Sequence, residues 1–112
     1  MDAIDDGECT LIVPFQKAFE RPGGAVSGPV FMAVADAAMW FAIVTRLGAR
    51  APSVTSELNT AFLNPARQED IRCNAKILKM GKRLIYGVAD CIGATSGHLL
   101  THHTITYMRL DT

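Results

Sequence analysis

The longest apolar stretch of the chain runs from Val30 to Val44, and Asp36 is its single charged residue. A stretch that is apolar on every side predicts one buried helix. Pro29 suits the first turn of this helix, and Gly48 suits its end. A carboxylate in such a helix is paired, hydrogen-bonded or used in chemistry, because a bare charge in an apolar interior is very costly. Asp36 is therefore the first candidate for a functional residue.

Elsewhere, polar and apolar residues alternate with the period of β-strands. The pattern predicts a short strand at 8–15, a helical turn at 16–20, a loop at 21–24, and then, after the helix, strands at 53–63, 70–80, 83–92 and 98–110. The short connections at 64–67, 80–82 and 93–97 predict consecutive hairpins and hence an antiparallel sheet. One apolar helix on such a sheet gives a two-layer α+β fold, with the sheet curved around the helix.

Composition narrows the class of protein. The 112 residues suffice for one domain spanning 1–112, and the eleven basic residues balance the eleven acidic ones. This balance argues against nucleic-acid binding through bulk charge. The cysteines, Cys9, Cys73 and Cys91, lie far apart in strand-like segments without metal-binding spacing, which predicts reduced thiols in a cytoplasmic protein. The acidic N-terminus is unlike a signal peptide, and Asp36 argues against a membrane-spanning helix.

Two motifs flank the start of the predicted helix: Gly-Ala-Val-Ser-Gly-Pro at 24–29, and then Ala-Asp-Ala-Ala-Met at 35–39. With these motifs, the order of elements over residues 8–110 resembles the hotdog fold, and within it the PaaI-like acyl-CoA thioesterases. The family typically has His-Gly-Gly, with an aspartate eight residues after the first glycine, as Asp36 follows Gly28. Ser27 replaces the histidine and Pro29 the second glycine, which leaves the substrate class open.

Further segments resemble the family's second strand with its following turn, at 54–59 and 62–66, and its basic strand-turn-strand, at 78–84. The resemblance implies hydrolysis of an acyl-CoA, or a related acyl thioester, to free acid and thiol. It implies no metal or redox cofactor, since coenzyme A is part of the substrate.

The resemblance makes Asp36 the nucleophile or the general base. Gly28 would polarise the thioester carbonyl, because free N–H groups and the dipole at a helix N-terminus favour an oxyanion. Thr55 occupies a position where the family often has a hydroxyl that orients water. Alternation predicts that Thr55, Glu57 and Asn59 share one face of a strand. The candidate substrate contacts are Ser27, Pro29, Phe31, Met32, Glu57, Asn59, Lys79, Lys82 and Arg83, the last three as ligands of the coenzyme A phosphates, with Arg67 a weaker candidate.

The spacing of Gly28 and Asp36 adds a constraint. Eight helical residues span about 12 Å. A donor and a nucleophile that serve one carbonyl both lie about 3 Å from it. The two residues therefore cannot serve one carbonyl from the same helix. We expect a homodimer, or a dimer of such dimers, in which Gly28 of one chain lies beside Asp36 of the other, giving two shared sites; a dimer would also cover the remaining apolar surface of the helix.

Other interpretations stay open. A non-catalytic module that binds acyl-CoA would keep the substrate cleft without needing Asp36, which could also be a structural carboxylate at the dimer interface. A hotdog dehydratase usually pairs a histidine with a carboxylate, and no histidine lies near the helix start. Adjacent strand residues point to opposite faces, so His102 and His103 cannot easily chelate one metal ion, and one of them is expected to face the core or the acyl groove.

Overall fold

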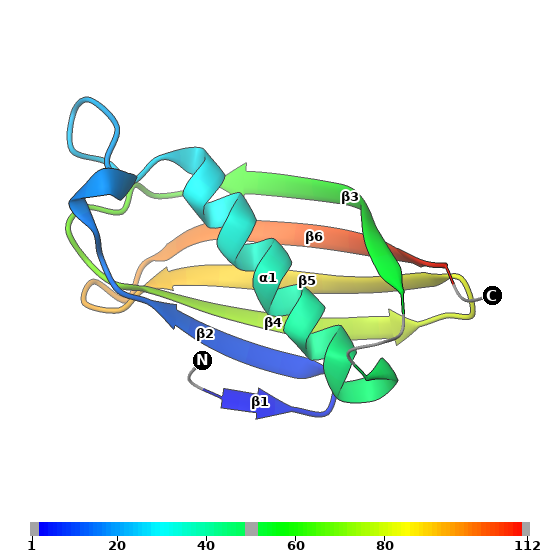
Figure 1. Cartoon of the computed structure of the whole chain (residues 1–112). Coiled ribbons are helices and arrows are strands. Elements are labelled where there is room, and N and C mark those ends of the chain that lie inside the picture. Colours follow the sequence, from blue (N-terminus) through cyan, green and yellow to red (C-terminus); the bar gives the residue numbers. More distant parts are fainter. Residues whose placement is uncertain (1–2, 49–51, 111–112) are drawn as a thin grey trace.

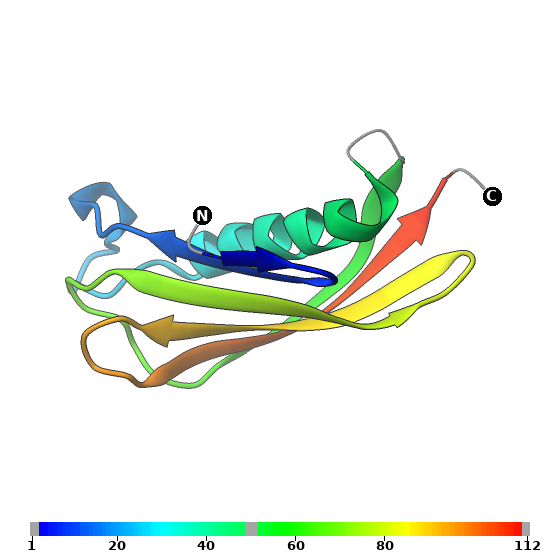
Figure 2. The same cartoon turned by 90° about the horizontal axis from the view of Figure 1, so that it is seen from below.

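A computed structural model describes residues 3–48 and 52–110 of the chain. Its one long helix, α1 (Gly28–Leu47), lies across one face of an antiparallel sheet, and a short 3₁₀ helix, η1 (Lys17–Phe19), precedes it (Figure 1). The strands are β1 (Ala3–Asp5), β2 (Glu8–Val13), β3 (Ser53–Phe62), β4 (Ile71–Met80), β5 (Leu84–Gly93) and β6 (Leu99–Arg109). Figure 2 shows the sheet curving around the helix, so the predicted α+β hotdog architecture is confirmed.

Local sequence sets both ends of α1. Ser27 is in an extended conformation at the N-cap and Pro29 occupies the first turn, where its missing N–H costs nothing. Gly48 ends the helix with φ of +81°, and its N–H donates a 2.9 Å hydrogen bond to the Val44 carbonyl. These residues therefore set where α1 begins and ends.

One face of α1 supplies the centre of the core. Its buried side chains are Phe31, Ala35, Ala38, Met39, Ala42 and Ile43. The opposite face is open in the single chain, where Met32 and Trp40 are each 38% exposed. The expectation of a helix enclosed on every side is therefore not met by one chain alone. By length and hydropathy α1 could also cross a membrane, yet here its apolar face packs on the sheet.

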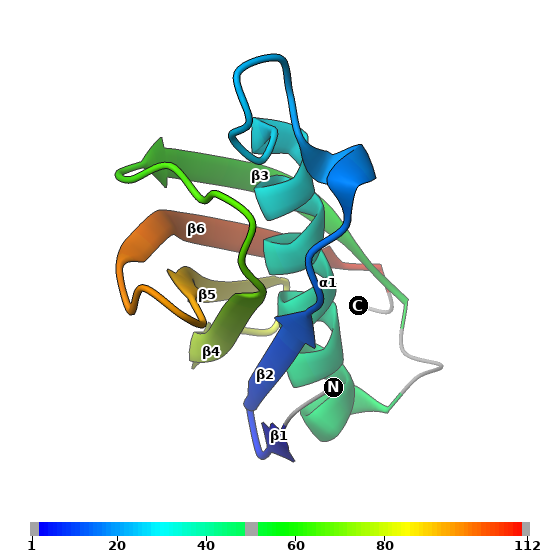
Figure 3. The ribbon, with the colours of Figure 1, turned by 90° about the vertical axis from the view of Figure 1, so that its left-hand side faces the viewer.

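The strand order is β1-β2-β4-β5-β6-β3. The predicted hairpins join β4, β5 and β6, but the prediction of a hairpin between β3 and β4 is wrong. After β3 the chain does not turn back, because the N–H groups of Leu63 and Asn64 both bond to the Leu100 carbonyl and hold it beside β6. The connection then crosses the end of the sheet to β4, which lies between β2 and β5 (Figure 3). The short β1 was also not predicted.

A bulge in β3 changes which side chains face the helix. Thr55 lies opposite Tyr107 of β6, whereas Glu57 lies opposite Thr106, so Ser56 is an extra residue. A bulge of this kind shifts the alternation by one position. Thr55 consequently faces α1, while Glu57 and Asn59 lie on the outer face of the sheet. The prediction that these three residues share a face is therefore wrong.

The helix-facing side of the sheet carries the three thiols. Cys9, Cys73 and Cys91 lie on β2, β4 and β5, as their strand-like surroundings predicted, and all three are buried and unbridged. Cys73 lies directly opposite Cys91. The hydrogen bond with Cys91, and then burial, raise the pKa of the Cys73 thiol.

Candidate active site

The carboxylate of Asp36 is held by hydroxyl groups from two strands. The Thr55 hydroxyl on β3 donates a 2.7 Å hydrogen bond to Oδ1 of Asp36, and the Tyr107 hydroxyl on β6 donates a 2.9 Å bond to the same oxygen. The Tyr107 hydroxyl also lies 3.2 Å from the Asp36 backbone carbonyl oxygen. Oδ2 of Asp36 accepts no hydrogen bond within residues 3–48 and 52–110. One carboxylate oxygen is thus anchored, and the other has no hydrogen-bond partner among the described residues.

Tyr107 is a site residue that sequence reasoning missed. Its side chain is only 3% exposed. Burial is the main reason that the pKa of Tyr107 is raised; the Asp36 carboxylate raises it further, while a hydrogen bond with Thr55 acts in the opposite direction. The hydroxyl therefore remains protonated, and remains a donor, above the usual range of tyrosine.

Gly28 is the first residue of α1 and lines a cleft of about 530 Å³. The cleft is bounded by Arg21, Ala25, Val26, Gly28, Pro29, Phe31, Phe62, Leu63, Asn64 and Pro65. No acceptor for the Gly28 N–H is found in the part of the chain that the structure describes. A Cβ at this position would lie 3.0 Å from the Phe62 ring, so glycine leaves room that a larger residue would fill.

Gly28 and Asp36 both belong to α1, and they lie beside opposite ends of β3. Gly28 lies beside Phe62 at the end of β3, whereas Asp36 lies beside Thr55 near its start. Eight residues of helix correspond to about 12 Å, and seven residues of strand to about 23 Å. Accordingly, neither Asp36 nor Thr55 lines the cleft at Gly28. A single chain does not bring the predicted donor and the predicted carboxylate to one carbonyl.

Comparison with known proteins places this arrangement in a family. The sequence profile described as "Thioesterase superfamily" matches residues 23–90, which include both Gly28 and Asp36. The chain belongs to the thioesterase superfamily. It is 30% identical over 83 residues to a candidate esterase of Thermoplasma volcanium, an alignment that covers 74% of this chain and 62% of that relative. The chain thus spans less than two thirds of the length of the relatives it matches.

Solved structures named as candidate thioesterases agree with the fold. A candidate thioesterase from a Silicibacter species superposes with a TM-score of 0.88 at 30% identity, over 96% of this chain and 76% of that one. A candidate thioesterase of Ralstonia eutropha related to phenylacetic acid degradation gives 0.85 at 27% identity, over 95% and 80%. The hotdog thioesterase resemblance inferred from the sequence is therefore confirmed.

The remaining predicted contacts lie in several separate places. Ser27 occupies the N-cap position of α1 without a side-chain capping hydrogen bond, Pro29 and Phe31 line the cleft, and Met32 lies on the open face of α1. Glu57 and Asn59 are exposed on the outer face of the sheet, away from Thr55.

The basic residues lie elsewhere. Lys79, Lys82 and Arg83 are exposed in and beside the β4–β5 connection, at the end of the sheet where β3 starts and β6 ends. They are therefore on the Thr55 side of the molecule and not on the Gly28 side. Arg67 lies near the cleft instead, where its Nη1 donates a 2.7 Å hydrogen bond to the Gly23 carbonyl.

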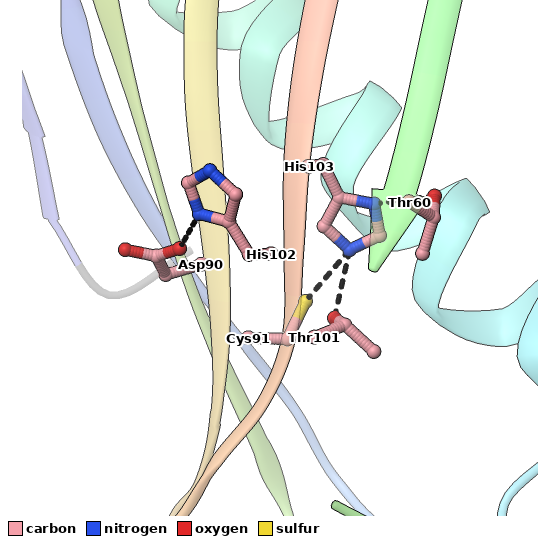
Figure 4. Close-up of polar contacts among 6 residues, drawn as sticks. All are labelled: Thr60, Asp90, Cys91, Thr101, His102 and His103. Carbon is pink, nitrogen blue, oxygen red and sulfur yellow. Dashed lines mark hydrogen bonds and ion pairs between the residues drawn. The ribbon is translucent and has the colours of Figure 1, made fainter. Parts of the chain in front are cut away.

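His102 and His103 point to opposite faces of β6, as predicted (Figure 4). His103 is fully buried, with Nδ1 2.9 Å from the Thr60 hydroxyl and Nε2 2.7 Å from the Thr101 hydroxyl. His102 lies on the outer face and pairs with Asp90 at 2.5 Å. Among the described residues, no cluster of three or more histidine, cysteine, aspartate or glutamate side chains could hold a metal ion.

Proposed function

We propose that this chain hydrolyses an acyl-CoA, or a related acyl thioester, to the free acid and the thiol. The proposal rests on two groups of α1. Asp36 has one carboxylate oxygen held by hydrogen bonds and the other without a donor in the described chain. Gly28, eight residues earlier at the start of the helix, has an N–H that lacks an acceptor in the described chain. This combination occurs in a member of the thioesterase superfamily. It supplies two groups that thioester hydrolysis can use: a hydrogen-bond donor for the developing oxyanion, and a carboxylate that acts as nucleophile or base.

Two routes are consistent with these groups. In the first, an oxygen of Asp36 attacks the carbonyl carbon, the C–S bond breaks, and the thiolate leaves; water then attacks the resulting anhydride, which regenerates the Asp36 carboxylate and releases the free acid, and the proton lost by the water passes to the thiolate. In the second, Asp36 removes a proton from water while the water oxygen attacks the carbonyl, and that proton passes to the departing thiolate. In both routes one water is consumed for each thioester.

The role of Gly28 follows from its position. Its N–H points out of the first turn of α1, where the helix dipole favours negative charge. A donor held there stabilises the oxyanion that develops on the thioester carbonyl without reorganising during the reaction. Because the neighbouring Pro29 has no N–H, the Gly28 N–H carries this task at that point of the turn.

A homodimer can unite the separated groups. β3 is an edge strand of the described sheet, most of its residues are exposed, and the open face of α1 runs alongside. Antiparallel pairing of β3 with the same strand of a second copy, about the centre of the strand, would bring the Phe62 end of one chain to the Thr55 end of the other. Gly28 of one subunit would then lie near Asp36 of the partner subunit, giving two sites per dimer.

The same arrangement suggests a place for the coenzyme A moiety. In a dimer of this kind, the Thr55 side of one subunit borders the Gly28 cleft of the other, and Lys79, Lys82 and Arg83 lie at that side. Lysine and arginine bind phosphate, so these residues are proposed to hold the phosphates of coenzyme A at the mouth of the shared site. The unbridged cysteines suit a reducing compartment, and we propose that the protein acts in the cytoplasm.

The test is a panel of acyl-CoA thioesters, with thiol release followed by a thiol-reactive dye. The Asp36→Asn variant keeps an oxygen that can accept the Thr55 and Tyr107 hydrogen bonds but removes the charge. We expect the parent to hydrolyse at least one thioester, and we expect this variant to lose at least about a hundredfold in kcat. Asp90→Asn, on the outer face of the sheet, is the matched control and should retain activity. Tight binding without turnover by the parent would instead identify a binding module.

A further inference from the structure

We propose that Tyr107 is a positioning residue that, with Thr55, anchors Oδ1 of Asp36 and leaves Oδ2 as the oxygen that reacts. This assignment rests on the proposed thioesterase function and adds a residue to it. It also names which of the two carboxylate oxygens is presented to the thioester or to water.

The contacts define the anchor. Three elements meet at one oxygen: α1 supplies Asp36, β3 supplies the Thr55 hydroxyl at 2.7 Å, and β6 supplies the Tyr107 hydroxyl at 2.9 Å. The terminal torsion of an aspartate is broad, and either oxygen can point forward when the group is unrestrained. Two donors that converge on the same oxygen favour one orientation of the carboxylate. The charge-assisted hydrogen bond from each donor to Oδ1 adds to that preference.

Tyr107 is the more rigid of the two donors. Thr55 is exposed and lies beside the bulge at Ser56, near the start of an edge strand. Tyr107 lies on β6, which is paired on both sides, with β5 and with β3, and its ring is almost completely buried. The Tyr107 hydroxyl is therefore fixed relative to the sheet, whereas Thr55 completes the contact from a less constrained position.

The second contact of Tyr107 extends this role to the helix. Its hydroxyl lies 3.2 Å from the Asp36 backbone carbonyl oxygen, so the same group touches both the side chain and the main chain of one residue. This contact ties the middle of α1 to β6 at the position of the carboxylate. A shift of about 1 Å in a reacting group can cost a large factor in rate, which is why such a tie matters for catalysis.

The test compares two substitutions that each remove one phenolic hydroxyl. Tyr107→Phe removes the anchor, while Tyr86→Phe removes the other tyrosine of the chain, which is on the outer face of β5 and 40% exposed. Steady-state hydrolysis of the best acyl-CoA substrate should show kcat lowered about ten- to hundredfold by Tyr107→Phe, with KM changed less than about twofold. Tyr86→Phe should match the parent in both constants.

A second background separates positioning from general support of the fold. If Tyr107 acts through the Asp36 carboxylate, Tyr107→Phe should cause no further loss of kcat in the Asp36→Asn chain. An equal loss in both backgrounds, a rise in KM alone, or parental kinetics for a folded Tyr107→Phe chain would each overturn the assignment. These results differ from failure of the proposed function, in which the parent hydrolyses no thioester or Asp36→Asn is as active as the parent.

A further measurement does not depend on the folding of Tyr107→Phe. In the Tyr86→Phe chain Tyr107 is the single tyrosine, so growth on difluorotyrosine places a more acidic phenol at that position alone. Loss of its proton removes the donor and puts a second negative charge beside Asp36. The alkaline fall in kcat should therefore begin at lower pH than in the same chain with ordinary tyrosine. Superimposable pH profiles would refute the role.

Discussion

Substitution of Gly87 tests how closely α1 must pack on the sheet for the site to form. Gly87 lies on the helix-facing side of β5, directly under Met39. A Cβ at this position would overlap the Met39 methyl group and lie 2.6 Å from the Lys76 backbone carbonyl oxygen. The methionine side chain can move by itself, whereas the Lys76 carbonyl belongs to the backbone of the neighbouring strand β4 and moves only with that strand. Gly87→Ala therefore forces either β4 or α1 to shift.

The expected cost can be expressed as a melting temperature. Overpacking of a core by one carbon costs about 1–3 kcal/mol. With an unfolding entropy of about 2.1 cal/mol/K per residue, a chain of 112 residues loses about 4 °C for each kcal/mol, so the Tm should fall by about 4–13 °C. Because Met39 follows Asp36 by less than one helical turn, the same shift should move the carboxylate away from Thr55 and Tyr107 and lower kcat.

Thermal unfolding followed by circular dichroism measures the loss of Tm in Gly87→Ala. A double-mutant cycle with Met39→Ala shows whether that loss comes from contact with the Met39 side chain. Met39→Ala alone leaves a cavity and should cost about 2–5 kcal/mol. It also frees the space that the new Cβ needs. The double variant should therefore be more stable than the sum of the two single costs predicts. A Gly87→Ala chain with the same Tm as the parent would show that this contact is not tight. Losses of unfolding free energy that simply add in the double variant would show the same.

Two further predictions follow from buried polar groups. The fold raises the pKa of Tyr107, so the contribution of this tyrosine to the free energy of unfolding should be complete below about pH 10 and decline as the pH rises above that value. Absorbance titration of the Tyr86→Phe chain should show tyrosinate forming at higher pH in the folded than in the unfolded protein. His103→Phe should remove the partner of the buried Thr101 hydroxyl and lower the free energy of unfolding by about 1–3 kcal/mol in urea titrations, whereas an unchanged midpoint would show that the histidine is dispensable.

Local patterns predicted most of the elements. The ends of α1 and of the longer strands agree with the sequence prediction to within one or two residues, because capping residues and alternation act over short distances. Asp36 could also be singled out from sequence, since a lone charge in an apolar helix needs a partner or a use.

Long-range pairing could not be predicted in this way. Nothing in the residues of β3 indicates that it pairs with β6 and not with β4, and the bulge at Ser56 has no glycine or proline to mark it. These two features decide that Thr55 faces the helix while Glu57 does not, and they place Tyr107 opposite Thr55. Tyr107 was missed because its place in the site depends on its pairing with Thr55, which is more than fifty residues away in the sequence.

The shared site is tested most directly by combining two inactive chains. Gly28→Pro removes the proposed oxyanion donor at a position where the preceding Ser27 is already extended, as a residue before proline must be. Co-expression with Asp36→Asn, under two different affinity tags, allows purification of dimers that contain one chain of each kind. Such a dimer has one site with both groups intact and one with neither, so we predict about half of the parental activity per dimer. Mixed dimers as inactive as either variant alone would contradict the account.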